Sequence, residues 1–551
     1  MFHKNLFINN MRKPDKKFEN IILMILFLIF LFLRLFSDSN YFVMQSRDDT
    51  RYLTLANNFP YQTIYNHQFF IMHPPLYPYI VHFFSLVIED YKAGIIVSLI
   101  SAALTFFILY DLIKIVTKNY IIALFSTILY SISQIFITHS TRALKESFAV
   151  MIALASIYFY IKYLKHGKVK ELIYSSVFGS LMALTTDHVV LLIPALASCY
   201  ILFGKKVILL KSSTPLLLTV ITYSFWMLTR LYIYTHYNYY PAGIDGVVVD
   251  TSKWGFNQLL SSHYFVETSQ IIPSGFSFQI SNYLYPVLYM LNTEIAPWPS
   301  QLQLKNVPIL FSFKYFPQLV IYSFLSIAAI WGFYRIIKSL VKIRIRENSM
   351  LLFTILFLIF AIPLTQKLVY PKYTITAIVF LYVIISFGLY EIIKKSYAVV
   401  KGFTLLVIII LILYLPFYLH SNPYFVLSKE KIVEASKTAD YLKQLPNDGI
   451  MAQIGYTEEL IYLTGKRILA LPINSSYIFL IDQYNISYLV YGELNVKPYS
   501  ESNKDDVHNY DTIKYIKEHS NRFKLLNVVE ETYPHSDKKD NLYIYKVSQK
   551  G

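Results

Sequence analysis

The feature that most constrains the fold of this chain is a series of apolar runs separated by short polar segments. Each run is close to the roughly 20 residues that an α-helix needs to cross a bilayer. The runs lie at 21–36, 93–113, 119–137, 147–164, 171–186, 188–204, 213–231, 317–337, 349–366, 373–393 and 402–420. They predict a mainly α, polytopic bundle of about eleven membrane-spanning helices.

Composition supports a membrane protein and excludes an ordinary soluble one. Of the 551 residues, 55% are hydrophobic and only 15% are charged, whereas soluble domains have about 25% charged residues. The single cysteine, Cys199, lies inside an apolar run, so there is no disulfide framework and no cysteine metal site. Basic residues precede the first run, but no small-residue cleavage site follows it. We therefore expect a retained first span with a cytoplasmic N-terminus.

The net charge of +16 comes from short loops and does not indicate a nucleic-acid partner. Residues 427–551 hold 16 Lys and Arg against 17 Asp and Glu, so the excess lies in residues 1–426. Alternate loops are basic, as the positive-inside rule requires for cytoplasmic loops. The basic residues of these inner loops are Lys114, Lys118, Lys165, Lys168, Lys170, Lys205, Lys206, Arg335, Lys338, Lys342, Arg344, Arg346, Lys394, Lys395 and Lys401.

Two predicted outer regions, 38–92 and 232–316, are long. Within the first, segment 74–87 is aromatic and apolar but begins with Pro-Pro, which favours an interfacial helix over a span. The second is rich in Tyr, Pro, Ser and Asn. We interpret region 232–316 in one of two ways. It is either a lid or acceptor-binding surface, or a structural cap that does not contact the substrate.

The composition changes after the last apolar run. A helical pattern at 429–445 is followed by β-like runs at 449–454, 467–471, 486–490, 525–529 and 542–547. This pattern predicts a small α/β domain. Eleven spans, an odd number, separate it from the cytoplasmic N-terminus, so we expect it on the extracytoplasmic side. We expect a membrane domain at residues 1–424 and this soluble domain at residues 425–551. The soluble domain is expected either to help bind an acceptor or partner, or to stabilise the assembly.

Charged groups at membrane boundaries tend to mark function, and on the predicted outer side they gather in four places. These are Asp48 and Asp49 between two arginines; Arg142, Lys145 and Glu146; Asp187 and His188; and Lys367, Tyr370, Lys372 and Tyr373. The carboxylates could remove a proton from a hydroxyl or bind a divalent cation. The basic groups could hold a phosphate.

Each of these groups also has a purely structural reading. Lys367 and Lys372 could snorkel at helix ends. For Asp187 and His188, a turn with a helix cap is the favoured reading. Arg142 and Glu146, four residues apart, could form a helical ion pair. The doubled acid at Asp48 and Asp49 could be an N-cap pair, but its position beside arginines favours a site.

These motifs together resemble those of the GT-C membrane glycosyltransferases. The stretch from Asp48 through Tyr52 to Ala56 is similar to their Asp-Glu-x-x-Tyr-x-x-x-Ala motif. His73-Pro-Pro-Leu76, Arg142 with Glu146, and more loosely Pro371-Lys-Tyr373 resemble elements of the protein O-mannosyltransferase and lipid A aminoarabinose transferase branch. The resemblance covers about residues 20–420. Two departures are Asp49 in place of Glu, and Lys372 where an Arg is common.

The resemblance implies an inverting glycosyltransferase of the plasma membrane that uses a polyprenyl- or dolichyl-phosphate sugar donor. Asp48 would be the general base, while Asp49 and Glu146 orient the acceptor or bind a divalent cation. Arg142 and Lys372 would stabilise the leaving phosphate. The acceptor would be a protein, lipid or glycan hydroxyl. The substrate-binding residues that the resemblance implies are Arg51, Tyr52, His73, Arg142, Lys145, Lys367, Lys372 and Tyr373.

Two other classes of membrane protein fit the same sequence pattern. A lipid or glycan transporter or flippase would also have many spans, but it often shows internal repeats, and this chain shows none. An inactive glycosyltransferase-like scaffold is the other alternative, which retention of both Asp48 and Asp49 disfavours. The lipid-phosphate donor that the resemblance implies needs no nucleotide, which agrees with the absence of a Gly-rich nucleotide loop.

Overall fold

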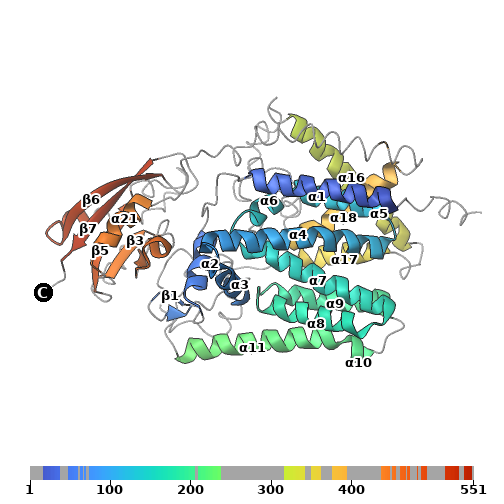
Figure 1. Cartoon of the computed structure of the whole chain (residues 1–551), viewed down its shortest axis with the longest axis horizontal. Coiled ribbons are helices and arrows are strands. Elements are labelled where there is room, and N and C mark those ends of the chain that lie inside the picture. The colour runs from blue at the N-terminus through green and yellow to red at the C-terminus, as the bar shows by residue number, and fades with distance from the viewer. Residues whose placement is uncertain are drawn as a thin grey trace, which may run out of the picture.

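A computed structural model of the chain describes much of the membrane part and a β-sheet near the C-terminus (Figure 1). The described residues are 16–37, 47–59, 63–65, 68–69, 74–204, 209–236, 316–341, 349–361, 375–393, 402, 436–446, 449–453, 460–466, 468–471, 481, 485–492, 516–532 and 539–548. Three sequence predictions lie outside them: the last apolar run beyond residue 402, most of the outer region 232–316, and the division at 424/425.

Helices form where the sequence has its apolar runs, from 21–36 to 373–393. They are α1 (Lys16–Ser37), α4 (Asp90–Thr117), α5 (Tyr120–Ile132), α6 (Gln134–Ser140), α7 (Lys145–His166), α8 (Val169–Ala183), α9 (Val189–Phe203), α10 (Leu209–Ser212), α11 (Thr214–His236), α16 (Phe316–Val341), α17 (Ser349–Phe360) and α18 (Ile375–Ile393). Among the described residues, four helices (α4, α7, α11 and α18) are long and apolar enough to cross a membrane. Three shorter helices are also apolar.

The structure divides one predicted span, 119–137, at Ser133. This residue has an extended backbone (ψ 121°) between α5 and α6, and the hydroxyl of Tyr382 donates to its side chain. A helix break inside a bundle leaves carbonyl groups that need donors. The carbonyl of Ser131 accepts from the guanidinium of Arg34 at 3.1 Å. Contacts from α1 and α18 therefore accompany the break, which the apolar pattern of the run does not reveal.

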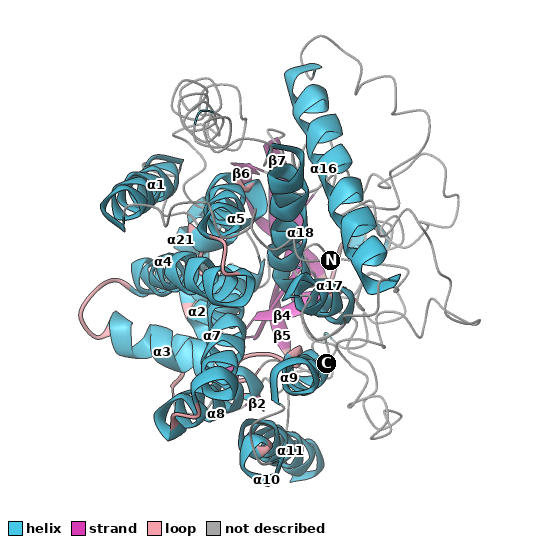
Figure 2. Ribbon diagram, turned by 90° about the vertical axis from the view of Figure 1, so that its right-hand side faces the viewer, coloured by secondary structure: helices cyan, strands magenta, loops and turns pink. Residues whose placement is uncertain are grey.

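Burial distinguishes central helices from those at the edge. In the apolar part of α7, 83% of residues are buried, against 22% in α11. Figure 2 shows α7 among other helices and α11 at the margin of the bundle. Leu217, Ile221, Phe225 and Leu228 of α11 are exposed apolar side chains. An apolar helix that is exposed along its length is stable in lipid, so α11 is a lipid-facing span.

Two glycines bring α16 and α18 into backbone contact. A Cβ atom on Gly388 would lie 1.8 Å from the carbonyl oxygen of Ala328, and one on Gly332 would lie 2.5 Å from the carbonyl oxygen of Ile384. Small residues let membrane helices approach this closely. The pair is also joined by an ion pair between Arg335 and Glu391, with the atoms 2.7 Å apart.

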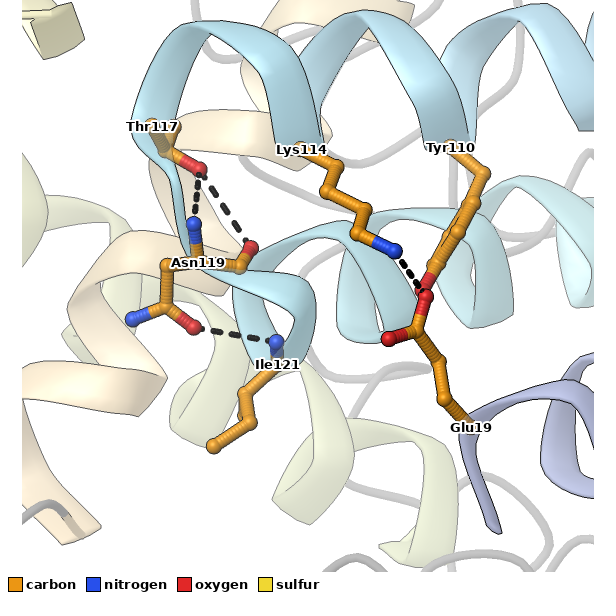
Figure 3. A network of polar contacts seen from close by, with 6 residues as sticks. All are labelled: Glu19, Tyr110, Lys114, Thr117, Asn119 and Ile121. Atoms are coloured by element: carbon orange, nitrogen blue, oxygen red, sulfur yellow. Dashed lines mark hydrogen bonds and ion pairs between the residues drawn. The ribbon is translucent and has the colours of Figure 1, made fainter. Parts of the chain in front are cut away.

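At one end of the bundle, a buried carboxylate ties α1 to α4. Figure 3 shows Glu19, in the first turn of α1, beside Tyr110 and Lys114 near the end of α4. Both of these side chains donate to Glu19 Oε1. Next in the chain, the Asn119 side chain accepts from the backbone N–H of Ile121 at 3.0 Å and so caps α5.

The opposite end of the bundle carries the short elements α2 (Arg47–Asn57), α3 (Leu76–Ser85), β1 (Thr63–Tyr65) and β2 (Gln68–Phe69). The two strands pair antiparallel. Helix α3 lies within the predicted interfacial segment 74–87. Tyr77 and Val81 are buried, whereas Phe83, Leu86 and Val87 at its C-terminal end are exposed. This one-sided exposure of large apolar groups is typical of a helix that rests on a membrane surface.

A five-stranded mixed sheet, which we call the C-terminal sheet, lies beyond this end of the bundle (Figure 1). Its strand order is β4-β3-β5-β7-β6, with β3 parallel to β4 and β5, and β7 antiparallel to β5 and β6. The strands lie close to the predicted positions. The elements are α21 (Ser436–Gln444), β3 (Gly449–Gln453), β4 (Ile468–Leu471), β5 (Ile486–Gly492), β6 (Phe523–Thr532) and β7 (Lys539–Val547).

Candidate functional site

The doubled acid of the sequence lies in the first turn of α2. Asp49, Tyr52, Leu53 and Ala56 are each 1% exposed or less. Their spacing of three and four residues places them on one face of the helix. Tyr52, Leu53 and Ala56 belong to the apolar core of the bundle, so Asp49 occupies the bundle side of α2. Asp48 is in the same helical turn.

Tyr77 of α3 connects α2 with α4 and α7. Its ring meets that of Tyr52 edge-on, with the centroids 5.4 Å apart. Its hydroxyl lies 3.1 Å from both the Gly94 carbonyl oxygen and the Ser98 hydroxyl. The Ser98 hydroxyl donates to the carbonyl of Leu144, the residue before α7, at 2.9 Å. This chain of contacts fixes the start of α7 relative to α3.

The approach of α4 to the turn before α7 requires a glycine. A Cβ on Gly94 would lie 2.6 Å from the Cβ of Ala143 and 3.3 Å from a methyl group of Leu53. Because those groups belong to the turn and to α2, Gly94 lets three elements converge. The first turn of α7, with Lys145 and Glu146, is thereby brought to the same end of the bundle as α2.

Lys145 and Glu146 are both buried, at 9% and 7% exposure. The ammonium of Lys145 lies 5.7 Å from the centre of the Tyr52 ring, within the range of a cation–π interaction. Glu146 Oε2 has no hydrogen-bond partner in the described part of the chain. A buried carboxylate oxygen without a donor is costly, so this oxygen is available to a ligand.

The carboxylates of Asp49 and Glu146 both affect the ionisation of Tyr77. Burial is the main cause that raises its pKa well above the usual value, and the negative charges of Asp49 and Glu146 raise it further. The hydrogen bond with Ser98 acts in the opposite direction. The Tyr77 phenol therefore stays protonated, and acidic groups of both α2 and α7 contribute to this.

The structure brings together some of the predicted site residues and does not describe others. Asp49, Tyr52, Lys145 and Glu146 form one cluster around Tyr77. Arg51 and Arg142 are half-buried on α2 and in the turn before α7. The residues that lie outside the described part are His73, Lys367, Tyr370, Lys372, Tyr373 and the side chain of Asp48.

Asp187 and His188 lie in a turn, as the structural interpretation predicts, but the helix cap in that interpretation is wrong. No side-chain cap hydrogen bond occurs at the start of α9. Asp187 instead forms a buried ion pair with Arg230 of α11, with Oδ1 and Nη1 3.1 Å apart. The hydroxyl of Tyr223 also donates to it at 3.4 Å. The sequence held a signal for this pair, because Arg230 is a charge in an otherwise apolar run.

Tyr77 itself was not assigned a role from the sequence, although it directly follows the His73-Pro-Pro-Leu76 element. The same element is anchored to the bundle by its last residue. The N–H of Leu76 donates to the carbonyl of Leu184, in the turn between α8 and α9, at 2.8 Å. A tyrosine next to a recurring motif was the available signal, but only the packing shows where its hydroxyl lies.

A metal site is not complete in the part of the chain that the structure describes. Within those residues, no group of three or more His, Cys, Asp and Glu side chains is placed to hold a metal ion. Asp49 and Glu146 are two buried carboxylates at the same end of the bundle, and oxygen ligands of this kind suit Mg²⁺, Mn²⁺ or Ca²⁺. The unpartnered Glu146 Oε2 is compatible with such a ligand.

Comparisons with known proteins give concordant results. Residues 72–232 match the family described as dolichyl-phosphate-mannose-protein mannosyltransferase. This segment contains Tyr77, Lys145, Glu146 and the Asp187–Arg230 pair. No curated protein matches the chain in sequence.

Two crystal structures of ArnT from Cupriavidus metallidurans are similar over nearly the whole chain. One is bound to undecaprenyl phosphate, with a TM-score of 0.55, and the other is in the apo state, with a TM-score of 0.52. In both cases the sequence identity is 10%, and the match covers 96% of this chain and 98% of the other. The motifs, the matching segment and the fold thus agree, and they confirm the resemblance of this multi-pass membrane chain to the GT-C glycosyltransferases.

Proposed function

We propose that this protein is an inverting membrane glycosyltransferase that moves a sugar from a polyprenyl-phosphate donor to a hydroxyl acceptor. The observation that carries the proposal is that Asp49 of α2 and Glu146 of α7 are both buried at the same end of the bundle, where the Lys145 ammonium lies 5.7 Å from the centre of the Tyr52 ring. Acids and a base gathered at one end of an apolar bundle provide the groups that such a transfer needs. The matching mannosyltransferase family and the fold shared with ArnT support the same chemistry.

The site end of the bundle is the outer one in this proposal. The other end carries Lys114, Lys118 and Lys165, which are basic residues of predicted cytoplasmic loops. Cytoplasmic loops carry the excess of Lys and Arg. The lipid of the donor would lie along apolar helices, and its phosphate would meet the basic groups of the site. Arg51, Arg142, Lys145, Lys367 and Lys372 are the residues that we assign to that phosphate, and Tyr52, His73 and Tyr373 to the rest of the substrate.

The reaction is a single displacement. The acceptor oxygen bonds to the anomeric carbon while the bond from that carbon to the donor phosphate oxygen breaks. The acceptor proton passes to Asp48, and the electron pair leaves with the polyprenyl phosphate, whose charge Arg142 and Lys372 stabilise. Attack from the face opposite the leaving group inverts the configuration of that carbon.

Asp49 and Glu146 have supporting roles in this scheme. Neighbouring residues of a helix point about 100° apart, so Asp48 and Asp49 do not share one position. Asp49 lies on the bundle side and, together with Glu146, orients the acceptor or holds a divalent cation. A cation bound there would neutralise charge on the donor phosphate.

Sugar release from the purified full-length protein tests the proposal. A panel of polyprenyl-phosphate sugars would be offered to the wild type, Asp48→Asn and Asp49→Asn in detergent, with and without a chelator. Loss of a general base costs about 10²- to 10⁴-fold in rate, and we expect this loss for Asp48→Asn while donor binding is retained.

The other outcomes discriminate among the alternatives. A loss confined to Asp49→Asn would move the base to Asp49. Equal release from all three proteins would contradict both assignments. If no donor and acceptor pair gives release, the same protein in vesicles would be assayed for movement of the lipid donor across the membrane, which the transporter reading requires.

A further inference from the structure

Helix α2, which carries both acids of the proposed site, is packed between the bundle and the C-terminal sheet. Tyr52, Leu53 and Ala56 belong to the core of the bundle. Leu55, fully buried, belongs instead to the core of the C-terminal sheet, with Leu460 and Ile461 among its members. An isolated helix of 11 residues is marginally stable in water. The position of α2 therefore depends on contacts from both sides.

A polar junction reinforces this packing at the end of α2. Asp90, the first residue of α4, accepts from the side-chain amide of Asn57, the last residue of α2, at 2.9 Å. It also interacts with the hydroxyl of Tyr462, in the helical turn between β3 and β4, and raises the pKa of that hydroxyl. One carboxylate thus joins the acidic helix, a membrane span and the C-terminal sheet.

The surroundings of Tyr462 agree with a fixed contact. Its ring is half-buried and packs against the core of the bundle. Burial raises the pKa of its hydroxyl, and the interaction with Asp90 raises it further. The phenol therefore stays protonated throughout the physiological pH range. Asp90 also lies in the first turn of α4, where the helix dipole stabilises a negative charge.

We infer that the C-terminal sheet positions the acidic helix for catalysis, through Leu55 and through the Asn57–Asp90–Tyr462 junction. The inference rests on the proposed transferase function. Tyr462 and Asn57 do not touch the reacting groups; they are positioning residues that act through α2. A displacement of about 1 Å at a catalytic group can cost about 10²-fold in rate, so a contact that fixes α2 controls turnover without binding substrate.

The experiment compares Tyr462→Phe with Tyr545→Phe in the full-length protein. Both substitutions remove one phenolic oxygen. Tyr462 lies in the helical turn between β3 and β4, whereas Tyr545 lies on β7, and its ring contacts are with Phe523 and Tyr543 of the sheet. We expect Tyr462→Phe to lower kcat about 5- to 10-fold with the donor KM within about twofold of the wild type. Tyr545→Phe should leave both values unchanged.

Amide hydrogen exchange provides a readout that is independent of activity. Loss of the junction should speed exchange at the amides of Thr50–Ala56 about 5- to 10-fold, because local opening becomes easier. Asn57→Ala should act in the same way. The double variant should be less affected than the product of the two single effects, since both side chains act through Asp90.

Unchanged kcat and unchanged exchange in Tyr462→Phe, relative to Tyr545→Phe, would overturn the inference. If the wild type shows no turnover with any donor, the proposed function fails, and exchange alone decides whether the sheet positions α2. Faster exchange in α2 would then support the positioning contact, and unchanged exchange would refute it.

Discussion

Two buried glutamates, one at each end of the bundle, differ in their partners. Glu19 lies in the first turn of α1 and Glu146 in the first turn of α7, at 5% and 7% exposure. The carboxylate of Glu19 accepts from Tyr110 and Lys114, whereas Glu146 Oε2 has no hydrogen-bond partner among the described residues. Both are placed where a helix dipole favours a negative charge.

The difference in partners indicates a structural role for Glu19 and a ligand-binding role for Glu146. Burial of an ionised group is costly unless hydrogen bonds or an opposite charge compensate. At Glu19 that compensation is present in the fold, so the group stabilises the contact between α1 and α4. At Glu146 it is incomplete, and a ligand can supply the missing partner. Replacement of Glu by Gln should therefore lower stability but not turnover at Glu19, and lower turnover but not stability at Glu146.

The largest expected effect is that of Glu146→Gln on turnover. Loss of an acidic group that orients substrate or cation should lower kcat about 10²- to 10⁴-fold, equivalent to about 3–5 kcal/mol in the activation barrier. Stability should be unchanged or higher, because an incompletely paired buried charge is removed. Sugar release and thermal unfolding in detergent measure the two quantities. A clear fall in unfolding temperature with normal turnover would assign Glu146 to the structure.

Arg230→Leu tests a buried acid that lies at the site end of the bundle but is paired with a cation. If pairing decides the role of a buried acid, Asp187 should act in stability like Glu19 and not in catalysis like Glu146. The substitution leaves Asp187 buried without its cation, which should cost about 3 kcal/mol or more in unfolding free energy. Replacing both residues, with Asp187→Leu and Arg230→Leu, should recover most of that loss. Chemical denaturation in micelles measures the change. If the single and double variants are equally destabilised, the charge itself is not the cause.

Glu19→Gln should have the smallest effect of the three. The amide oxygen can still accept from Tyr110, and the Lys114 side chain is 42% exposed, so solvent screens the lost ion pair. We expect a destabilisation of about 1 kcal/mol and unchanged kcat. The same two assays as for Glu146→Gln make the pair a matched comparison. A loss of turnover here would mean that the two ends are coupled.

The sequence predicted the helices and strands well because apolar periodicity is a local signal. The runs that became α4, α7 and α18 are recognisable by length and composition alone. The alternation of sides then predicted that the acids of α2 and α7 would lie at one end, and the first turns of α2 and α7, which carry Asp49 and Glu146, lie at the same end of the bundle. Predictions of this kind need only the order of the spans.

Features that depend on distant partners were not predictable in the same way. The break at Ser133 accompanies contacts from Arg34 and Tyr382, which are far away in the sequence. The pairing of Asp187 with Arg230 joins residues 43 positions apart. The placement of Leu55 in the core of the C-terminal sheet also requires the assembled fold. In each case the local sequence is compatible with several contact partners, and only the packing of the folded chain determines which of them is contacted.

The glycine contact between α16 and α18 has a consequence for how a lipid reaches the site. Where Gly388 meets the backbone of Ala328, there is no space even for a methyl group. An isoprenoid chain is wider than a methyl group, so it cannot slide from the bilayer through this seam. The two helices act there as a closed wall, so a lipid-linked donor of the kind proposed above would have to enter along another side of the bundle.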